Sequence, residues 1–127
     1  MVKANFLNLR VYQLAEQIAD AAAEIAVKWP AFHRDTLGEQ LVCAADSIGA
    51  NIAEGHGRGT YKDNRRFALI ARGSLYETQH WLRRAFHRKL LKNDQVKILK
   101  PLVDELGPKL NAYLKKMGQP KQSPPTK

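Results

Sequence analysis

The sequence predicts an all-α protein whose helices form an antiparallel up-and-down four-helix bundle. Four segments carry apolar residues at steps of three and four, the spacing of one helix face, and none shows the sustained alternation of a strand. Short connections join the segments, which favours antiparallel neighbours. A chain of 127 residues has room for one core. We therefore expect one bundle domain over residues 1–117 and a flexible, basic, proline-containing tail over residues 118–127, which lacks apolar side chains.

The first predicted helix covers residues 9–28. Its inward face holds the residues at helical spacing, namely Val11, Leu14, Ile18, Ala22, Ile25 and Trp29. An acidic ridge lies opposite, formed by Glu16, Asp20 and Glu24. The helix should stop at Trp29-Pro30, because proline disfavours helical backbone in the residue before it.

The second predicted helix covers residues 36–54, with Thr36 as its N-cap and Glu39 completing a capping box. Its core stripe is Leu37, Leu41, Ala44, Ala45, Ile48 and Ile52. Much of its remaining circumference is also small and uncharged, at Val42, Cys43, Gly49, Ala50 and Ala53. A helix of this kind is buried on more than one side. We therefore expect its second face to meet another subunit, with Cys43 as a small packing residue.

The third predicted helix covers residues 60–89 and carries most of the basic charge. Its broad inward face is Phe67, Ile70, Ala71, Ser74, Leu75, Thr78, Trp81, Leu82 and Ala85. At about 100° per residue, Arg65, Arg72 and Arg83 fall within about 20° of one another on the opposite side. The basic arc around them also contains Lys62, Arg66, Arg84, Tyr76, His80 and His87.

The fourth predicted helix covers residues 94–117, with a seven-residue repeat through Val96, Leu99, Val103, Leu106, Leu110, Tyr113 and Met117. Pro101 and Pro108 share one heptad position away from this seam. We therefore expect one helix curved or kinked at its solvent side rather than two short ones, although an interior proline costs roughly 3 kcal/mol.

The charge is divided unevenly between the two halves of the chain. Residues 1–57 have four Lys or Arg against seven Asp or Glu, whereas residues 58–127 have seventeen against five, so the halves carry −3 and +12. This asymmetry points to a polyanion, an acidic protein partner or the chain's own acidic half. A single cysteine excludes an internal disulfide framework, and no run approaches the roughly 20 apolar residues of a membrane span. We expect a cytoplasmic protein with no membrane partner.

Three blocks of the sequence resemble a known family. They are "LRVYQLA" from Leu9, "FHRDTLGEQLVCAADSIGANIAEGHGRG" from Phe32 and "FALIARGSLYET" from Phe67, and they resemble the signature blocks of the 23S rRNA-intervening-sequence protein family. The resemblance implies a four-helix bundle assembled as a ring-like homopentamer and no secure biochemical activity. The chain is more distantly similar to the accessory protein of diversity-generating retroelements, a basic pentamer, which implies nucleic acid and a reverse transcriptase as partner classes.

The chain departs from this family's pattern at several positions. Val42 and Cys43 stand where a basic pair is common, and Gly49 stands where proline is common. The residues Glu77, Thr78 and Gln79 replace a usual Glu-Leu-Glu. The outer face of the second helix is therefore less basic than is usual, which argues against a nucleic-acid surface there.

The glycine-rich stretch "GHGRG" at Gly55 is not expected to be a phosphate loop. A Walker loop needs a preceding strand and a Gly-Lys-Ser/Thr end, and a dinucleotide loop needs a strand and a downstream acid. We instead interpret Gly55 as the left-handed residue that ends the second helix. Asn51 and Glu54 are interpreted as packing and capping residues, with Gln40, Ser47 and Asn51 facing a neighbouring helix or the loop end.

No catalytic or metal site can be assembled from the motifs, so we expect neither an enzyme nor a cofactor. Glu77 and His80 have the spacing of one half of a di-iron bundle site, but the second Glu-x-x-His is absent. The leading hypothesis is a protein that binds RNA or DNA mainly through phosphates, using Arg58, Lys62, Arg65, Arg66, Arg72, Tyr76, Arg83, Arg84 and Arg88. The alternatives are a pentameric scaffold that docks an acidic partner such as a reverse transcriptase, and a merely solvated or self-paired basic face.

Overall fold

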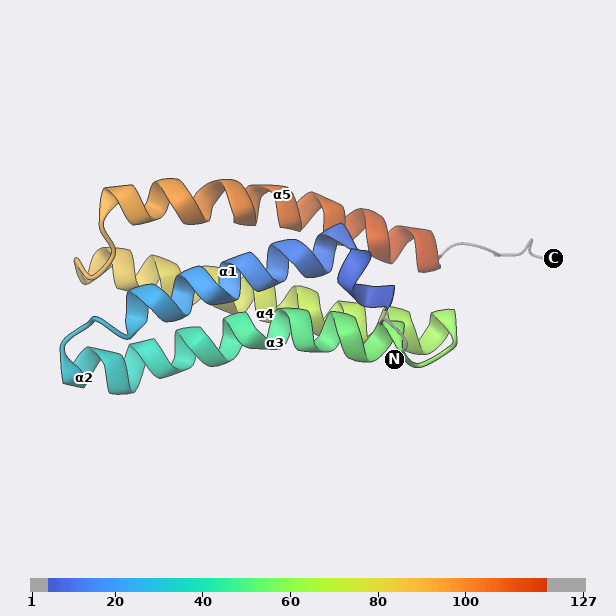
Figure 1. Cartoon of the computed structure of the whole chain (residues 1–127), viewed down its shortest axis with the longest axis horizontal. Coiled ribbons are helices and arrows are strands. Elements are labelled where there is room, and N and C mark those ends of the chain that lie inside the picture. The colour runs from blue at the N-terminus through green and yellow to red at the C-terminus, as the bar shows by residue number, and fades with distance from the viewer. Residues whose placement is uncertain (1–4, 119–127) are drawn as a thin grey trace.

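The computed structural model describes residues 5–118, and these form four helical rods packed side by side (Figure 1). The rods are α1 (Arg10–Ala26), α3 (Glu39–His56), α4 (Tyr61–His87) and α5 (Asn93–Gly118). A 3₁₀ turn, η1 (Asn5–Asn8), precedes α1, while α2 (Ala31–His33) and the π-helical turn η2 (Arg34–Gly38) lead directly into α3. No strand occurs over residues 5–118, so the predicted all-α class is confirmed. The tail expected over residues 119–127 lies outside the described residues.

The four rods pack in a closed cycle around one core. α1 contacts α3 and α5, and α4 contacts the same two helices. Figure 1 shows that each rod begins at the end of the bundle where the previous one stops. The largest fully buried side chains come from all four rods and include Leu14, Ile18, Leu41, Ile48, Ile52, Leu75, Leu106 and Leu110. None of the described helices is both long enough and apolar enough to cross a bilayer.

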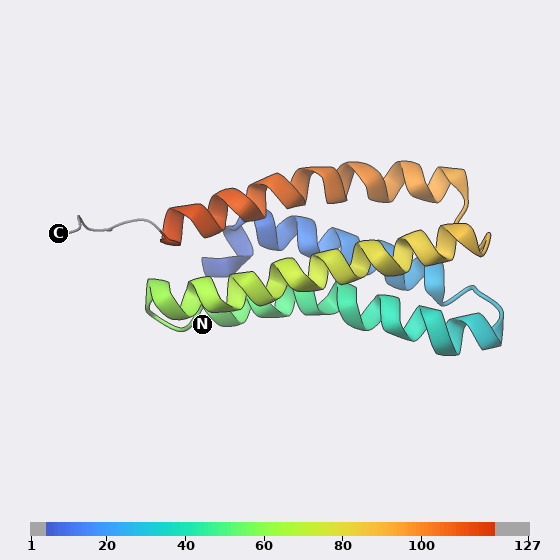
Figure 2. The same ribbon diagram turned by 180° about the vertical axis from the view of Figure 1, so that it is seen from behind.

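The inward face predicted for the first helix is confirmed, and five of the seven residues predicted for the fourth are buried, with Val96 and Tyr113 half-buried. All six residues assigned to the first helix are buried, including Trp29, whose Nε1 donates to Leu90 O at 2.9 Å. This bond ties the end of α1 to the loop between α4 and α5. α5 runs through Pro101 and Pro108, both exposed, and is gently arched over the bundle in Figure 2. One continuous helix is possible because both rings lie on its outer face.

The capping box expected at Thr36 is wrong. Helical backbone begins after Pro30 and continues through η2 into α3, so Thr36 lies inside helical structure. Its Oγ1 donates to Phe32 O at 2.7 Å, one turn earlier, instead of accepting a backbone N–H. A π-helical turn accommodates one extra residue, and in this one Leu37 and Gly38 are buried. Gly38 packs closely beside Ala26 and Trp29.

Ile70 was expected in the core and is instead 45% exposed. The buried stripe of α4 is narrow and made largely of small residues, namely Ala68, Ala71, Leu75, Thr78 and Ala85. Because successive residues are about 100° apart on a helix, Ile70 lies well outside this stripe. Ile70 therefore contributes an apolar patch to the outer surface of α4.

Candidate nucleic-acid interface

Three arginines line the seam where α4 meets α5. Arg65 lies against the end of α5, since a Cβ placed on Gly118 would be 2.6 Å from the Arg65 Nε. Arg72 Nη1 donates to Asn111 Oδ1 at 3.1 Å, and Arg83 borders a cleft between the two helices. α4 has 27 residues and is therefore about 40 Å long. The structure thus brings the three arginines into one row along the bundle, on one side of α4 as the helical spacing predicts.

Two further arginines flank one aromatic ring at the start of α4. The guanidinium carbons of Arg58 and Arg66 lie 4.9 and 4.6 Å from the centroid of Phe67. Each arginine also has an acidic neighbour, because Arg58 Nε is 3.5 Å from a Glu54 oxygen and Arg66 Nη2 is 3.7 Å from an Asp63 oxygen. Stacking and pairing restrict the two side chains. Lys62 is exposed on the same first turn.

The interpretation of Gly55 as the left-handed stop of the second helix is wrong. Gly55 lies inside α3, and the glycine with positive φ is Gly59, at +90°. A Cβ on Gly55 would lie 2.8 Å from both Asn64 Oδ1 and Phe67 Cβ. Gly55 is therefore required for the close approach of α3 to α4, which seats Phe67 and the arginines beside it.

Asn51 and Glu54 make local contacts along the chain. Asn51 Nδ2 donates to Ser47 O at 2.8 Å, one turn earlier in the same helix, and not to a neighbouring helix or loop. Glu54 pairs with Arg58. Glu54 thus belongs to the end of α3 as expected, whereas the expected inter-helix bond of Asn51 is not among the hydrogen bonds of residues 5–118.

Replacing Asn51 by leucine is expected to change the free energy of unfolding of one subunit by no more than about 0.5 kcal/mol. The lost bond lies within one helix, and leucine is the better helix former. Thermal and urea unfolding of the variant test this. A loss of stability above about 2 kcal/mol would mean that the Asn51 side chain hydrogen-bonds to a partner outside this chain.

The far end of α4 carries a second group of cations. Arg83 and Arg88 are exposed and Arg84 is half-buried. Lys89 and Lys92 are not among the predicted site residues; they belong to the adjoining loop and border the same surface as His87. Their clustering depends on how the loop folds, so helical spacing within α4 gave no signal for them.

Glu77 and His80, which have the spacing of one half of a di-iron site, both lie against Trp81. Glu77 Oε2 accepts from Trp81 Nε1 at 3.2 Å, and the His80 ring packs edge-on against Trp81 with centroids 4.6 Å apart. Over residues 5–118, no group of three or more His, Cys, Asp or Glu is placed to hold a metal ion. Tyr76 is 55% exposed and available for stacking.

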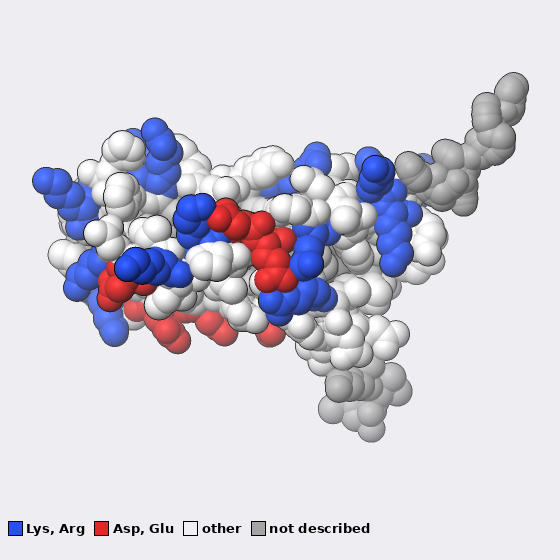
Figure 3. Space-filling view, turned by 90° about the horizontal axis from the view of Figure 1, so that it is seen from above, with Lys and Arg blue, Asp and Glu red and all other residues white. Residues whose placement is uncertain are grey.

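The acidic ridge does not neutralise α4 within the subunit. Over residues 5–118 the ion pairs are Arg10–Glu105, Arg34–Asp35, Glu54–Arg58, Asp63–Arg66, Lys100–Asp104 and Glu105–Lys109. None involves Glu16, Asp20 or Glu24. Figure 3 views the molecule from above α5, where basic groups are spread along the whole face and acidic groups gather near the middle, beside basic ones, and along one edge. Within the described residues, the self-pairing alternative therefore holds for Arg58 and Arg66, which pair with Glu54 and Asp63, and not for the acidic ridge.

The acidic ridge borders a hollow of about 310 Å³ between α1 and α3. Small residues line its floor, namely Ala15, Ala19, Gly49, Ala50 and Ala53, and the carboxylates of Glu16, Asp20 and Asp46 surround it. Tyr12 also lines the hollow and donates to Glu16 Oε2 at 3.2 Å. Burial raises the pKa of Tyr12, and the negative charges of Glu16 and Asp20 and the hydrogen bond to Glu16 raise it further. Cys43 was expected to be a packing residue and is instead exposed in the structure.

The chain was compared with known families and structures. The model of the family described as "23S rRNA-intervening sequence protein" matches residues 7–112. A crystal structure of a protein of unknown function from the S23 ribosomal protein family of Bacteroides thetaiotaomicron is similar in fold. Its TM-score is 0.73 at 20% sequence identity, and the match covers 83% of this chain and 98% of that chain. No curated protein sequence matches.

These comparisons agree with the four-helix architecture and with the sequence blocks from Leu9, Phe32 and Phe67. At 20% identity the solved structure carries only the fold. The family match spans most of the bundle, and the chain belongs to the 23S rRNA-intervening sequence protein family.

Proposed function

We propose that this protein is a non-enzymatic, cytoplasmic binder of RNA or DNA that holds phosphates along α4. The observation that carries the proposal is the row of Arg65, Arg72 and Arg83, with no acid of the ridge paired to it in the subunit. Arginine presents five donors in a planar fork that fits phosphate oxygens. Arg72 uses one donor on Asn111 and keeps the others for a ligand.

Each end of α4 carries further cations beside this row. Arg58, Lys62 and Arg66 lie near the start and Arg84 and Arg88 near the end, while Tyr76 offers an exposed aromatic face between them. A strand lying along about 40 Å of helix would meet several phosphate contacts in succession. Anisotropy with a labelled RNA strand and a labelled duplex, each titrated between about 50 and 200 mM salt, tests the proposal. Affinity that is weak at low salt, or constant across the range, contradicts it.

We further propose that antiparallel bundles of this chain assemble as a homopentamer through the hollow between α1 and α3. Its small-residue floor permits close approach, and its carboxylates suit a basic surface on the neighbouring copy. A head-to-tail contact of two different surfaces closes into a ring when the rotation between copies allows it. Five copies would also repeat the cationic row and strengthen its field.

Replacing Ala50 by arginine is expected to dissociate the assembly into folded monomers. Ala50 is an exposed residue of the small-residue floor, so the long arginine side chain fills the hollow without entering the subunit's own core. Light scattering after size exclusion measures the mass, and circular dichroism checks the fold. Ala112→Arg, at an exposed position on α5, is the matched control and should keep the wild-type mass. A wild-type mass for the Ala50 variant would place the subunit contact elsewhere.

A second candidate function is a scaffold for an acidic protein partner, such as a reverse transcriptase. The observation that favours it is the pair of exposed hydrophobic side chains, Ile70 and Tyr76, among the cations of α4. Aromatic residues with nearby arginines are typical of protein interfaces. One polypeptide that co-purifies after nuclease treatment, and is lost with Ile70→Asp, would favour the scaffold over nucleic acid.

A further inference from the structure

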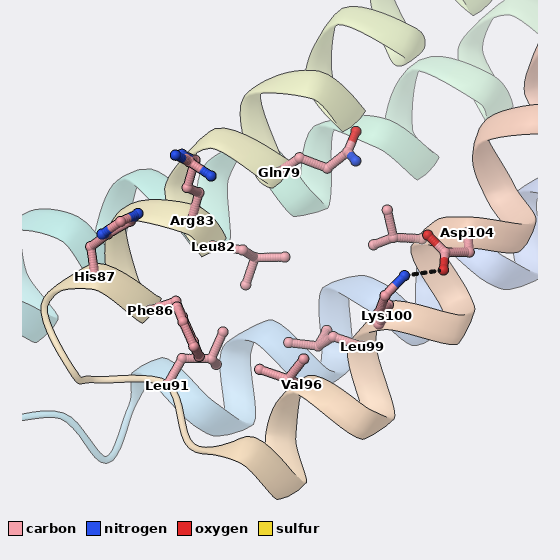
Figure 4. A pocket seen from close by; sticks show the side chains of 11 residues that line it. Gln79, Leu82, Arg83, Phe86, His87, Leu91, Val96, Leu99, Lys100 and Asp104 are labelled. Carbon is pink, nitrogen blue, oxygen red and sulfur yellow. Dashed lines mark hydrogen bonds and ion pairs between the residues drawn. The ribbon is translucent and has the colours of Figure 1, made fainter.

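A cleft of about 520 Å³ opens between the end of α4 and the first half of α5. Its floor is apolar and is formed by Leu82, Leu91, Val96, Leu99 and Val103. Figure 4 shows Arg83 and His87 on one side and Lys100 on the other, with the apolar side chains between them. Asp104 is the one acid in the lining, and it is already paired with Lys100 at 2.7 Å. The volume lies in the range of small-ligand sites.

A second hollow adjoins the first and is more polar. It has a volume of about 450 Å³ and shares Phe86, His87 and Leu91 with the cleft. Lys89, Lys92 and Asn93 complete its lining. The apolar cleft and the lysine-lined hollow thus meet at Phe86, a residue that is 51% exposed. An apolar compartment beside a cationic one matches the two halves of a nucleotide, the base and the phosphate.

The backbone conformation of Lys89 favours a ligand site at this place, because Lys89 occupies a position that suits glycine. It is the non-glycine residue with positive φ, +62°, over residues 5–118. Lys89 N donates to Phe86 O at 3.0 Å and Leu90 N donates to Ala85 O at 2.9 Å, which is the bonding of a Schellman helix end. Glycine would relieve the left-handed strain but would remove the cation. Strained backbone of this kind clusters at functional sites.

We propose that the cleft and its adjoining hollow hold one unpaired nucleotide of a single strand. The base stacks on Phe86 over the aliphatic floor, and the phosphates on either side contact Arg83, Lys89 and Lys92. Gln79 on the wall supplies an amide for the base edge. This inference rests on the proposed nucleic-acid function and adds to it a preference for unpaired over duplex substrate. A paired base is stacked within its helix and cannot enter the cleft.

The test compares Phe86→Ala with wild type on an RNA strand carrying one 2-aminopurine and on a duplex of the same length. Wild type should change the fluorescence of the 2-aminopurine, and Phe86→Ala should abolish this change. The variant should also bind the strand about tenfold more weakly, because a factor of ten lies within the range that one stacked base contributes. Its affinity for the duplex should be unchanged.

Two further variants make the result specific. Phe32→Ala removes another exposed phenylalanine, on α2 and outside the cleft, and should match wild type. Lys89→Gly removes the cation at a position that glycine suits, and should weaken strand binding without loss of stability.

The possible outcomes distinguish this inference from the proposed phosphate-binding function on which it rests. Equal loss on strand and duplex with Phe86→Ala would overturn the inference, as would unchanged strand binding by both Phe86→Ala and Lys89→Gly. In either case the phosphate-binding function would stand. A wild type that binds neither substrate at low salt would overturn both.

Discussion

Replacing Arg65, Arg72 and Arg83 together by glutamine is expected to weaken nucleic-acid binding by roughly 100-fold at low salt. The three side chains form one row along the α4–α5 seam and contribute three of the charges that a phosphate backbone would meet. At about 1 kcal/mol for each charged contact, the loss is about 3 kcal/mol, which is about two powers of ten in affinity. The slope of log affinity against log salt should fall by about three, one for each phosphate that the variant no longer neutralises.

The matched control removes three charges elsewhere. Lys28, Arg34 and Lys109 are exposed, and none lies along the α4–α5 seam. Changing all three to glutamine gives the same net charge, +6 in place of +9. If the protein's overall field dominated, both triple variants would lose affinity equally. An unchanged salt slope in the seam variant would show that α4 does not hold the phosphates.

Residue spacing predicted most of the buried stripes of α1 and α5, and in α4 it named four of the five buried residues but also the exposed Ile70. In α1 and α5 leucine and isoleucine mark the inward stripe, so spacing alone identifies it. In α4 the stripe is largely Ala and Thr, and the more hydrophobic Ile70 stands outside it. Hydrophobicity therefore predicted burial for the wrong residue. The close packing of α4 against its neighbours, rather than side-chain polarity, determines which of its residues are buried.

The cationic row was predictable because it depends on one helix alone, whereas the cleft was not. The cleft takes its lining from the end of α4, the loop residue Leu91 and the first half of α5. Several of these residues have the apolar spacing of core positions. Residue spacing alone does not show that two helices leave a space between them. Phe86 was the available signal, since a large aromatic residue lies outside the predicted inward face. A single exposed aromatic residue is common on protein surfaces, so this signal was weak.

Replacing Gly55 by alanine is expected to lower the free energy of unfolding by about 1–2 kcal/mol. Alanine adds about 1 kcal/mol of helix propensity, but overpacking here costs about 2–3 kcal/mol. The new Cβ would lie 2.8 Å from Phe67 Cβ and 3.0 Å from the main-chain oxygen of Asn64. Neither atom is the end of a flexible side chain, so α4 itself must move away from α3. Urea unfolding monitored by circular dichroism measures the change.

Gly73 provides the control for this prediction because it is also a helical glycine and has no atom near its added Cβ. With open space around it, Gly73→Ala should stabilise the protein by about 0.5–1 kcal/mol through helix propensity alone. The opposite signs of the two variants would isolate the contact between α3 and α4. The movement at Gly55 also displaces Phe67, on which Arg58 and Arg66 stack, so only the Gly55 variant should bind nucleic acid more weakly. If both alanine substitutions stabilise the protein equally, the close approach at Gly55 does not determine the position of the start of α4.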